Sequence, residues 1–518
     1  MASARSLVDD LRATAARHGD RTATIDGTIT LTYAELDSIA EHIAQALHGL
    51  DVRPGDCAVW HGAKCSLAVA AVHGILRSGA GYVPVDPDAP IARAELIVGR
   101  IRPRVLVADT AARDQWRTVE PGLAWQELPG PGLAGKLWFA IPKGVPREPV
   151  ADLAYVLHTS GSTGHPKGVV HTHASASAFV DWSVQELRLT EHDVIINSAP
   201  LHFDPTTLHL FGAARVGAAV ALMPASAAPF PAAYIKFCRQ VGGTVWYAVT
   251  STLAWLTRWG KDLLPELRGL RAAVVGGEAL QPDDVNVLLS ALPKVRLLNV
   301  YGPTESNICT FHEIRGLQQP DVVIPIGRVL PGAEIAVVDE RLEPVEVGRP
   351  GQLLVRGTML MAGYLDPDQT VRSLVRTSDH REWYASGDLV RENPAGELEF
   401  IGREDTQIKS RGFRVELGEI ERHLHALDSV HDCVAVATPD AVFSNLITVF
   451  VTADHLDYIK ALPDLLRAGL PHYMVPQRII HVADELPRNS NGKVDRKALT
   501  ELAARPSLGD APGLTVLR

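Results

Sequence analysis

Short apolar runs recur along the chain and alternate with stretches in which apolar residues have helical spacing. The runs occupy residues 23–25, 57–60, 105–107, 154–157, 194–197, 219–223 and 272–275. They are too short and too continuously apolar for surface helices, whereas parallel strands buried on both faces have this character. The pattern therefore predicts an α/β fold, with several layers of helices around its β-sheets.

The pattern changes in the C-terminal part of the chain. Over residues 323–400, short alternating runs are separated by the turn signals RPGQ and NPAGE, which predicts a β subdomain. The polar segment GREDTQIKS at 402–410 then marks a boundary. The elements expected beyond it are a helix over 417–427, strands over 433–438 and 446–451, and a helix over 458–466. Together they form a small α+β domain.

These patterns divide the chain into three regions. We expect a large N-terminal domain at residues 1–404, a small α+β C-terminal domain at 405–505, and a disordered tail at 506–518. Inside the large domain, residues 121–149 are crowded with proline and glycine. Such crowding predicts an irregular connection.

Composition is typical of a globular enzyme and narrows the choice of partners. Of the 518 residues, 46% are hydrophobic and 21% are charged, and the net charge at pH 7 is −10. A net negative charge disfavours a nucleic-acid partner. The N-terminus lacks the apolar core of a signal peptide, and no stretch of about 20 residues is continuously apolar. We therefore expect a cytoplasmic protein that does not enter a membrane.

The cysteines do not form a recognisable framework. They are Cys57, Cys65, Cys238, Cys309 and Cys433. They are odd in number, scattered, and contain no CxxC pair, which fits thiols in a reducing compartment and predicts no metal site.

A glycine-rich loop, HTSGSTGHPKGVVH at residues 158–171, follows one of the predicted strands. Glycines at such a place let backbone N–H groups and hydroxyls approach phosphates closely. The loop is not a P-loop, because His165 and Pro166 separate Gly164 from Lys167 and Gly168 stands where serine or threonine is required. A flexible turn is the alternative for a generic Gly-Ser loop.

The spelling TSGSTGxPKG resembles the phosphate loop of the adenylate-forming superfamily, which contains acyl-CoA synthetases, luciferases and the adenylation domains of nonribosomal peptide synthetases. Further segments match that family in order: LTYAEL (31–36), ILRSGAGYVPVDPDAP (75–90), HFD (202–204), NVYGPTES (299–306), GYL (363–365), YASGDLV (384–390), GREDTQIKSRGFRVELGEIE (402–421), LPHYMVP (470–476) and NGKVDRKAL (491–499). The spellings are closest to amino-acid-activating domains.

This resemblance implies a two-step ligase that uses ATP and Mg²⁺. A carboxylate attacks the α-phosphate of ATP, and positioning with charge neutralisation supplies the catalysis. By resemblance Glu305 binds Mg²⁺, which prefers carboxylate oxygen. The residues implied for ATP binding are Thr159, Ser160, Gly161, Thr163, Lys167, Gly277, Asn299, Tyr301, Thr304, Asp388, Arg403 and Lys493.

The same resemblance assigns the reacting groups. Lys493 is expected to bridge the substrate carboxylate and ATP oxygens, which stabilises charge in the transition state. His202 matches an active-site ring, although a core histidine is an equal alternative. For the second step the C-terminal domain is expected to rotate about a hinge at Asp405, so that Lys409 replaces Lys493 at the site.

Asp204 points to the substrate class. In amino-acid-activating relatives an aspartate at this position pairs with the α-ammonium, a charge-assisted contact. Alignment by motif assigns the rest of the pocket to Pro205, Leu208, Tyr247, Val274, Gly276, Val300, Ile308 and Cys309. These residues offer no second charge, the bulk of Leu208 and Tyr247 shortens the pocket, and Gly276 is expected to return some space. The resemblance therefore implies a small neutral amino acid, alanine first and proline next.

The expected acyl acceptor is the phosphopantetheine thiol of a separate carrier protein, in natural-product or antibiotic biosynthesis. No carrier segment follows NGKVDRKAL, so we expect a free-standing, monomeric ligase. The alternatives are an acyl-CoA synthetase, which Asp204 disfavours, a ligase for β-amino acids, and a nucleotide-binding regulatory protein without catalysis. Glu305, Asp388, Lys409 and Lys493 argue against the last of these.

Overall fold

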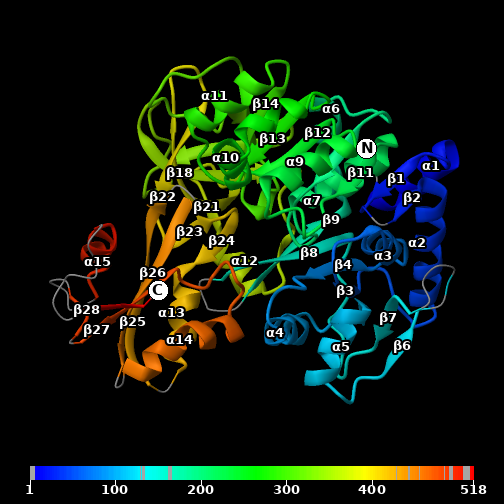
Figure 1. Cartoon of the computed structure of the whole chain (residues 1–518), viewed down its shortest axis with the longest axis horizontal. Coiled ribbons are helices and arrows are strands. Elements are labelled where there is room, and N and C mark those ends of the chain that lie inside the picture. Colours follow the sequence, from blue (N-terminus) through cyan, green and yellow to red (C-terminus); the bar gives the residue numbers. More distant parts are fainter. Residues whose placement is uncertain are drawn as a thin grey trace. The chain divides into compact units, whose positions relative to one another are not determined.

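The computed structural model describes residues 6–27, 29–128, 130, 135–161, 166–427, 429–440, 444–453, 456–483, 485–488, 494–505 and 514–517. The chain forms two compact units, whose elements Figure 1 labels. The larger unit comprises Met1–Pro87, Ile97–His158 and Gly168–Glu404, and the smaller comprises Asp88–Leu96, Thr159–Lys167 and Asp405–Arg518.

A nine-stranded sheet within the described residues runs in the order β16-β15-β14-β13-β12-β10-β11-β1-β2. Its strands are β1 (Thr22–Ile25), β2 (Thr30–Thr32), β10 (Val194–Asn197), β11 (Ala219–Leu222), β12 (Val245–Val249), β13 (Ala272–Gly276), β14 (Arg296–Tyr301), β15 (Thr310–Ile314) and β16 (Arg328–Val329). Neighbours from β14 to β1 pair in parallel. The other three strands pair antiparallel at the edges.

An eight-stranded sheet, counted over the same described ranges, has the order β19-β9-β8-β4-β3-β5-β7-β6. Its strands are β3 (Cys57–His61), β4 (Gly81–Val85), β5 (Val105–Asp109), β6 (Trp125–Glu127), β7 (Leu137–Ala140), β8 (Leu153–Thr159), β9 (Lys167–Thr172) and β19 (Gly363–Tyr364). Parallel pairs join β3 to β4 and β5, and β4 to β8. All seven predicted apolar runs are thus strands in parallel pairs, as predicted.

The irregular connection predicted at 121–149 is wrong for two of its segments. Strand β7 pairs antiparallel with β5, and β6 pairs with β7. Leu137 and Phe139 of β7 are buried in the core of the unit. Tertiary pairing therefore outweighs the local proline and glycine content.

The α-helices up to Ser373 are α1 (Leu7–His18), α2 (Tyr33–His48), α3 (Ser66–Arg77), α4 (Ile91–Ile101), α5 (Thr110–Val119), α6 (His173–Glu186), α7 (Pro205–Thr207), α8 (Ala213–Val216), α9 (Pro231–Gln240), α10 (Thr250–Trp259), α11 (Pro282–Ala291) and α12 (Pro367–Ser373). A π-helix, η1 (Leu208–Gly212), joins α7 to α8, and the 3-10 helices η2 (Lys261–Glu266) and η3 (Thr304–Ser306) lie further on. Helices α9 to α11, green in Figure 1, bury one apolar face against β12 and β13. Helices α1 to α3 and α6 contribute to a separate core cluster.

The β subdomain predicted at 323–400 is confirmed as an antiparallel sheet. Its strands are β17 (Ala333–Val338), β18 (Pro350–Gly357), β20 (Leu374–Arg376), β21 (Glu382–Glu392) and β22 (Leu398–Arg403). They pair through β18 and β21.

The smaller unit contains the α+β elements predicted after residue 405. They are β23 (Gln407–Ser410), β24 (Phe413–Glu416), α13 (Leu417–His425), β25 (Val430–Asp440), β26 (Ser444–Ala453), α14 (Leu456–Gly469), β27 (Arg478–Val482), α15 (Arg496–Ala503) and β28 (Leu514–Leu517). The disorder predicted for the tail is wrong for Leu514–Leu517, because this segment pairs antiparallel with β27.

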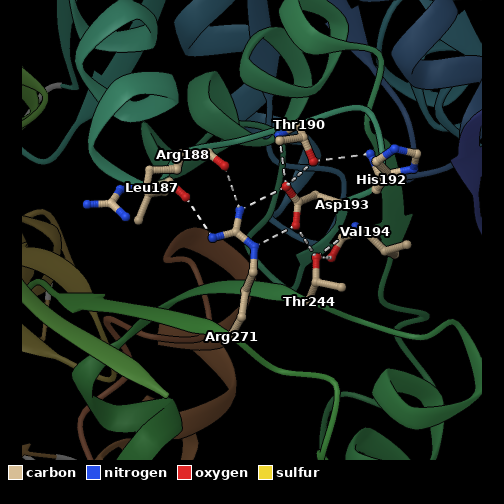
Figure 2. A network of polar contacts seen from close by, with 8 residues as sticks. All are labelled: Leu187, Arg188, Thr190, His192, Asp193, Val194, Thr244 and Arg271. Carbon is tan, nitrogen blue, oxygen red and sulfur yellow. Dashed lines mark hydrogen bonds and ion pairs between the residues drawn. The ribbon is translucent and has the colours of Figure 1, made fainter. Parts of the chain in front are cut away.

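A polar network ties the amino ends of three strands of the nine-stranded sheet (Figure 2). Arg271, next to β13, donates to both carboxylate oxygens of Asp193 at 2.8 Å. Asp193, next to β10, also accepts from the amide of Thr190 at 2.9 Å and from Thr244 Oγ1 at 2.7 Å. Burial alone would raise the pKa of Asp193, but these hydrogen bonds and the Arg271 charge lower it below its usual value. The network therefore stabilises the sheet at the amino ends of β10, β12 and β13.

Two further features concern possible membrane-spanning helices and the cysteines. Among the helices of the described residues, none combines the length and the apolar character needed to cross a membrane. The five cysteines, all of which the structure describes, form no disulfide.

Candidate active site

Strands β12, β13 and β14 carry four residues of the predicted amino-acid pocket: Tyr247, Val274, Gly276 and Val300. Tyr247 is in register with Asn197 and Val274, and Gly276 is in register with Val300. In-register neighbours of a parallel sheet project to the same face. Five of the predicted lining residues belong to one buried cluster: Leu208, Tyr247, Val274, Val300 and Ile308. Pro205 is buried at the start of α7.

Gly276 does not have the role expected for it. A Cβ atom built on it would lie 2.4 Å from Val300 O and 2.8 Å from Val300 Cγ2. The place of the missing side chain is therefore filled by the neighbouring strand, and the expectation that Gly276 returns space to the pocket is wrong.

Cys309 packs in another apolar cluster than the five lining residues named above. It is fully buried, and it belongs to a different apolar cluster with Tyr301, Leu353 and Val390. The motif alignment assigned it to the pocket with Ile308, but consecutive residues of an extended segment face opposite sides.

Asp204 lies where the HFD segment enters α7. Burial first, and the charge of Asp204 second, raise the pKa of the Tyr247 hydroxyl. Burial also raises the pKa of Tyr155, where hydrogen bonds with Thr207 and Asn307 lower it and the Asp204 charge adds a smaller increase. The Asp204 carboxylate is therefore electrostatically coupled to two phenol groups of the buried interior. An ammonium ion is the partner that such a carboxylate favours.

Several polar residues beside this pocket were not predicted. His209, in π-helix η1, accepts a hydrogen bond at Nδ1 from Asn197 Nδ2 at 2.9 Å. Burial, and then the charge of Lys64, lower the pKa of His209 to about 3, so its ring is neutral. Lys64 Nζ donates to the carbonyl oxygens of Asn197 and Ala199 at 3.0 and 3.1 Å. A π-helix often marks a functional site, but its one-residue expansion leaves no signal in sequence periodicity.

His202 is mostly buried and faces an acid. Its Nε2 lies 3.8 Å from Asp86 Oδ2, and its ring makes an edge contact with Phe203. Asp86 directly follows β4, and His202 lies in the segment between β10 and α7.

The residues predicted to bind adenosine come together where β14 meets strands β21 and β22 of the β subdomain. Tyr301 Oη donates to Asp388 Oδ2, and Arg403 Nη1 donates to Asp388 Oδ1. Asp388 and Arg403 are directly opposite each other in β21 and β22. Asn299 lies two residues before Tyr301 on β14, and its Nδ2 donates to Pro325 O at 2.7 Å. All four predicted residues therefore occupy one region of the larger unit.

The YGPTES turn holds Glu305 in a buried position. Glu305 Oε1 accepts a hydrogen bond from Tyr364 Oη at 2.6 Å. The preceding residue, Thr304, accepts at its carbonyl oxygen from His171 Nε2 at 2.8 Å, and burial lowers the pKa of His171 to about 4. The turn requires Gly302, since a Cβ there would lie 2.4 Å from Ile308 Cα.

The glycine-rich loop is described only in part. Thr163 and Lys493 lie outside the described residues. Within the smaller unit, Ser160 Oγ donates to Arg414 O at 2.8 Å and Arg422 donates to Gly161 O at 3.0 Å. Thr159 is buried at the end of β8, and Lys167 begins β9.

The remaining predicted residues lie in two places. Gly277 follows β13 with a φ of 103°, a conformation that favours glycine. In the smaller unit, Asp405 Oδ1 accepts from the amide of Gln407 at 3.1 Å, and Lys409 lies on β23 opposite Arg414.

Comparison with known proteins defines the class of this chain. The family model described as AMP-binding enzyme matches residues 11–365, and the model of the AMP-binding enzyme C-terminal domain matches residues 419–493. The fold and these matches are those of an adenylate-forming ligase. The chain belongs to the AMP-binding enzyme family.

Two relatives match over nearly their whole length. An L-proline–[L-prolyl-carrier protein] ligase of Pseudomonas fluorescens is 36% identical over 93% of this chain and 96% of its own. A ligase with the same name from Streptomyces coelicolor is 33% identical over 96% of this chain and 97% of its own. Among solved structures, a nonribosomal peptide synthetase protein with adenylation and carrier domains is 26% identical, with a TM-score of 0.80 over 95% of this chain and 84% of that one.

Proposed function

We propose that this ligase activates a small neutral α-amino acid as its aminoacyl-AMP and transfers it to the phosphopantetheine thiol of a separate carrier protein. The observation that carries the proposal is Asp204, electrostatically coupled to Tyr247 beside the cluster that contains Val274 and Val300. The pocket residues alone favour alanine over proline. Because the two relatives above are named for L-proline, proline takes first place in the proposal and alanine second.

In the first step a carboxylate oxygen of the amino acid attacks the α-phosphorus, the bond to the β-phosphate bridging oxygen breaks, and pyrophosphate leaves. In our proposal Asp204 holds the ammonium group, and Lys493 neutralises charge between the carboxylate and the phosphate. Tyr301 and Asn299 contact adenine, and Asp388 and Arg403 hold the ribose. Ser160, Thr163, Thr304 and Lys167 contact the phosphates.

The donor set at Glu305 fits Mg²⁺. No group of three or more His, Cys, Asp or Glu side chains that could hold a metal occurs among the described residues. Mg²⁺ commonly takes one or two carboxylates and completes its shell with nucleotide phosphates and water. Glu305 supplies one such carboxylate, and bound Mg²⁺ would neutralise phosphate charge.

In the second step the carrier thiolate attacks the acyl carbon, and AMP leaves with the electrons of the acyl–phosphate bond. We propose that domains 1–404 and 405–505 reorient about Asp405 between the steps, so that the face carrying Lys409 takes the place of Lys493. This hinge assignment is supported by the family motif GRED and is open to test by substitution of Asp405 with proline. That variant should retain adenylation and lose transfer.

The test of the proposed function is ATP–pyrophosphate exchange across the twenty amino acids, β-alanine and benzoate. Exchange with proline or alanine that is lost in Lys493→Ala and in Asp204→Asn is expected. Exchange that requires an acid without an α-amine would contradict the role of Asp204 and favour the acyl-activating alternative.

A further inference from the structure

We propose that Tyr155 is a positioning residue that couples the amino-acid site to the phosphate and metal site through its hydroxyl group. The inference rests on the proposed function and deepens it. The reaction requires the carboxylate held near Asp204 to lie in line with the phosphate held near Glu305. A displacement of about 1 Å between reacting groups can cost about a hundredfold in rate.

The first arm of the coupling starts at α7. The carbonyl oxygen of Asp204 accepts from the amide of Thr207 at 2.9 Å. Thr207 Oγ1 in turn donates to Tyr155 Oη at 3.2 Å. The segment that carries the proposed ammonium partner is therefore bonded to the tyrosine hydroxyl.

The second arm runs from Tyr155 to the YGPTES turn. Tyr155 Oη donates to Asn307 Oδ1 at 3.2 Å. Asn307 closes the turn through its amide, which donates to Thr304 O at 3.4 Å. The same Thr304 oxygen accepts from His171 Nε2 at 2.8 Å. One hydroxyl thus bridges the two segments on which the reactants are proposed to be held.

The bridge lies in the dry interior. Tyr155 is 0% exposed, Thr207 1% and Asn307 4%. Hydrogen bonds in such surroundings are strengthened by the low dielectric and polarise one another. Asn307 also has a φ of 55°, a conformation that non-glycine residues adopt rarely and that cooperating contacts must hold in place.

Tyr155 also connects to the glycine-rich loop. It lies on β8, which leads into that loop, and its ring packs at 5.0 Å from the ring of His171 on β9, which leads out of it. Tyr155 therefore lies on the strand before the loop and packs against a residue of the strand after it.

The test compares Tyr155→Phe with Tyr82→Phe in steady-state pyrophosphate exchange. Tyr82 is a matched control, because it is equally buried and its ring lies 5.4 Å from that of Tyr155, while its hydroxyl takes no part in the bridge. We expect Tyr155→Phe to lower kcat about tenfold with less than threefold change in either KM, because reactants are bound but misaligned. Tyr82→Phe should retain kcat.

Variants of Thr207 separate the loss of the bridge from any effect of Tyr155→Phe on folding. Thr207→Val should reproduce the fall in kcat and Thr207→Ser, which keeps the hydroxyl, should restore it. The double variant Tyr155→Phe with Thr207→Val should be no slower than either single variant, since both remove the same bridge. Multiplicative losses, or an unchanged kcat in Tyr155→Phe, would overturn the inference. Absence of amino-acid-dependent exchange in the wild type would instead overturn the proposed function.

Discussion

Val300 fills the space beside Gly276 that a side chain at position 276 would need. The 2.4 Å from an added Cβ on Gly276 to Val300 O is a distance that real Cβ atoms essentially never show. The glycine therefore serves a close approach between two strands. In the pocket we propose, the side chain of Val300 would therefore set the limit beside Gly276.

Val300→Ala should admit longer neutral amino acids. Removing two methyl groups lengthens the pocket, so kcat/KM for valine or leucine relative to proline should rise about tenfold for each methylene that newly fits. Val275→Ala is the matched control, because Val275 faces the opposite side of β13 and packs with the other cluster. Relative rates across the aliphatic series measure the effect. Equal changes in both variants would contradict the assignment.

Much of this architecture follows from sequence pattern. Apolar runs at residues 57–60 and 272–275 predict strands because both faces of a parallel strand must be covered. The same reasoning fails for residues 121–149 and for the tail at 506–518. Strands β7 and β28 in these segments are stabilised by pairing with other strands rather than by local propensity. The position of a residue within a sheet thus outweighs its immediate neighbours in the chain.

Some residues of the candidate site could be predicted from sequence motifs and others could not. The motifs assigned Tyr301, Asp388 and Arg403 to one nucleotide, and the structure brings their side chains into contact. The bridge through Tyr155 had no sequence signal, because its hydroxyl joins residues 52 and 152 positions away. The place of Cys309 in the pocket stays a prediction, and it packs in an apolar cluster other than that of Ile308.

Tyr301 allows ring and hydroxyl contributions to ATP binding to be separated. Tyr301→Phe keeps the ring and removes the hydrogen bond to Asp388, so we expect the KM for ATP to change less than threefold. Tyr301→Ala should raise it about tenfold, because base–aromatic stacking contributes about 1–3 kcal/mol. Asp388→Asn should raise it as well. A large effect of Tyr301→Phe alone would assign the hydroxyl, not the ring, to nucleotide binding.

Lys64 should give the protein a pH-dependent stability on the alkaline side. Burial lowers the pKa of its ammonium to about 7, whereas an unfolded lysine titrates near 10.4. Between about pH 7 and pH 10 the unfolded chain binds the additional proton, so stability rises with pH through that range. Lys64→Met should remove this rise, by a few degrees in the unfolding midpoint. Parallel melting curves at pH 7 and pH 9.5 test it, and equal slopes would contradict it.

Arg271→Met should destabilise the larger unit by about 2 kcal/mol, the range for hydrogen bonds to a charged group. The lowered pKa of Asp193 means that its contribution is present above the unfolded value near 3.9 and is lost as pH falls through the folded value. The difference between wild type and variant should therefore shrink below about pH 4. Arg315→Met is the control, because that arginine side chain is 85% exposed. A control as unstable as the variant would contradict the prediction.

The network in Figure 2 has a practical consequence for changing this enzyme. Asp193, Thr244 and Arg271 each directly precede a strand, and these strands, β10, β12 and β13, go on to Asn197, Tyr247 and Gly276. If the proposed pocket sets selectivity, the residues that stabilise the sheet through this network and those that would select the substrate are different. Substitutions that raise thermal stability can be made around Asp193 and Arg271, and substitutions that change substrate specificity around Tyr247 and Gly276. Because no hydrogen bond or ion pair of the described residues joins these two pairs, their effects should be additive.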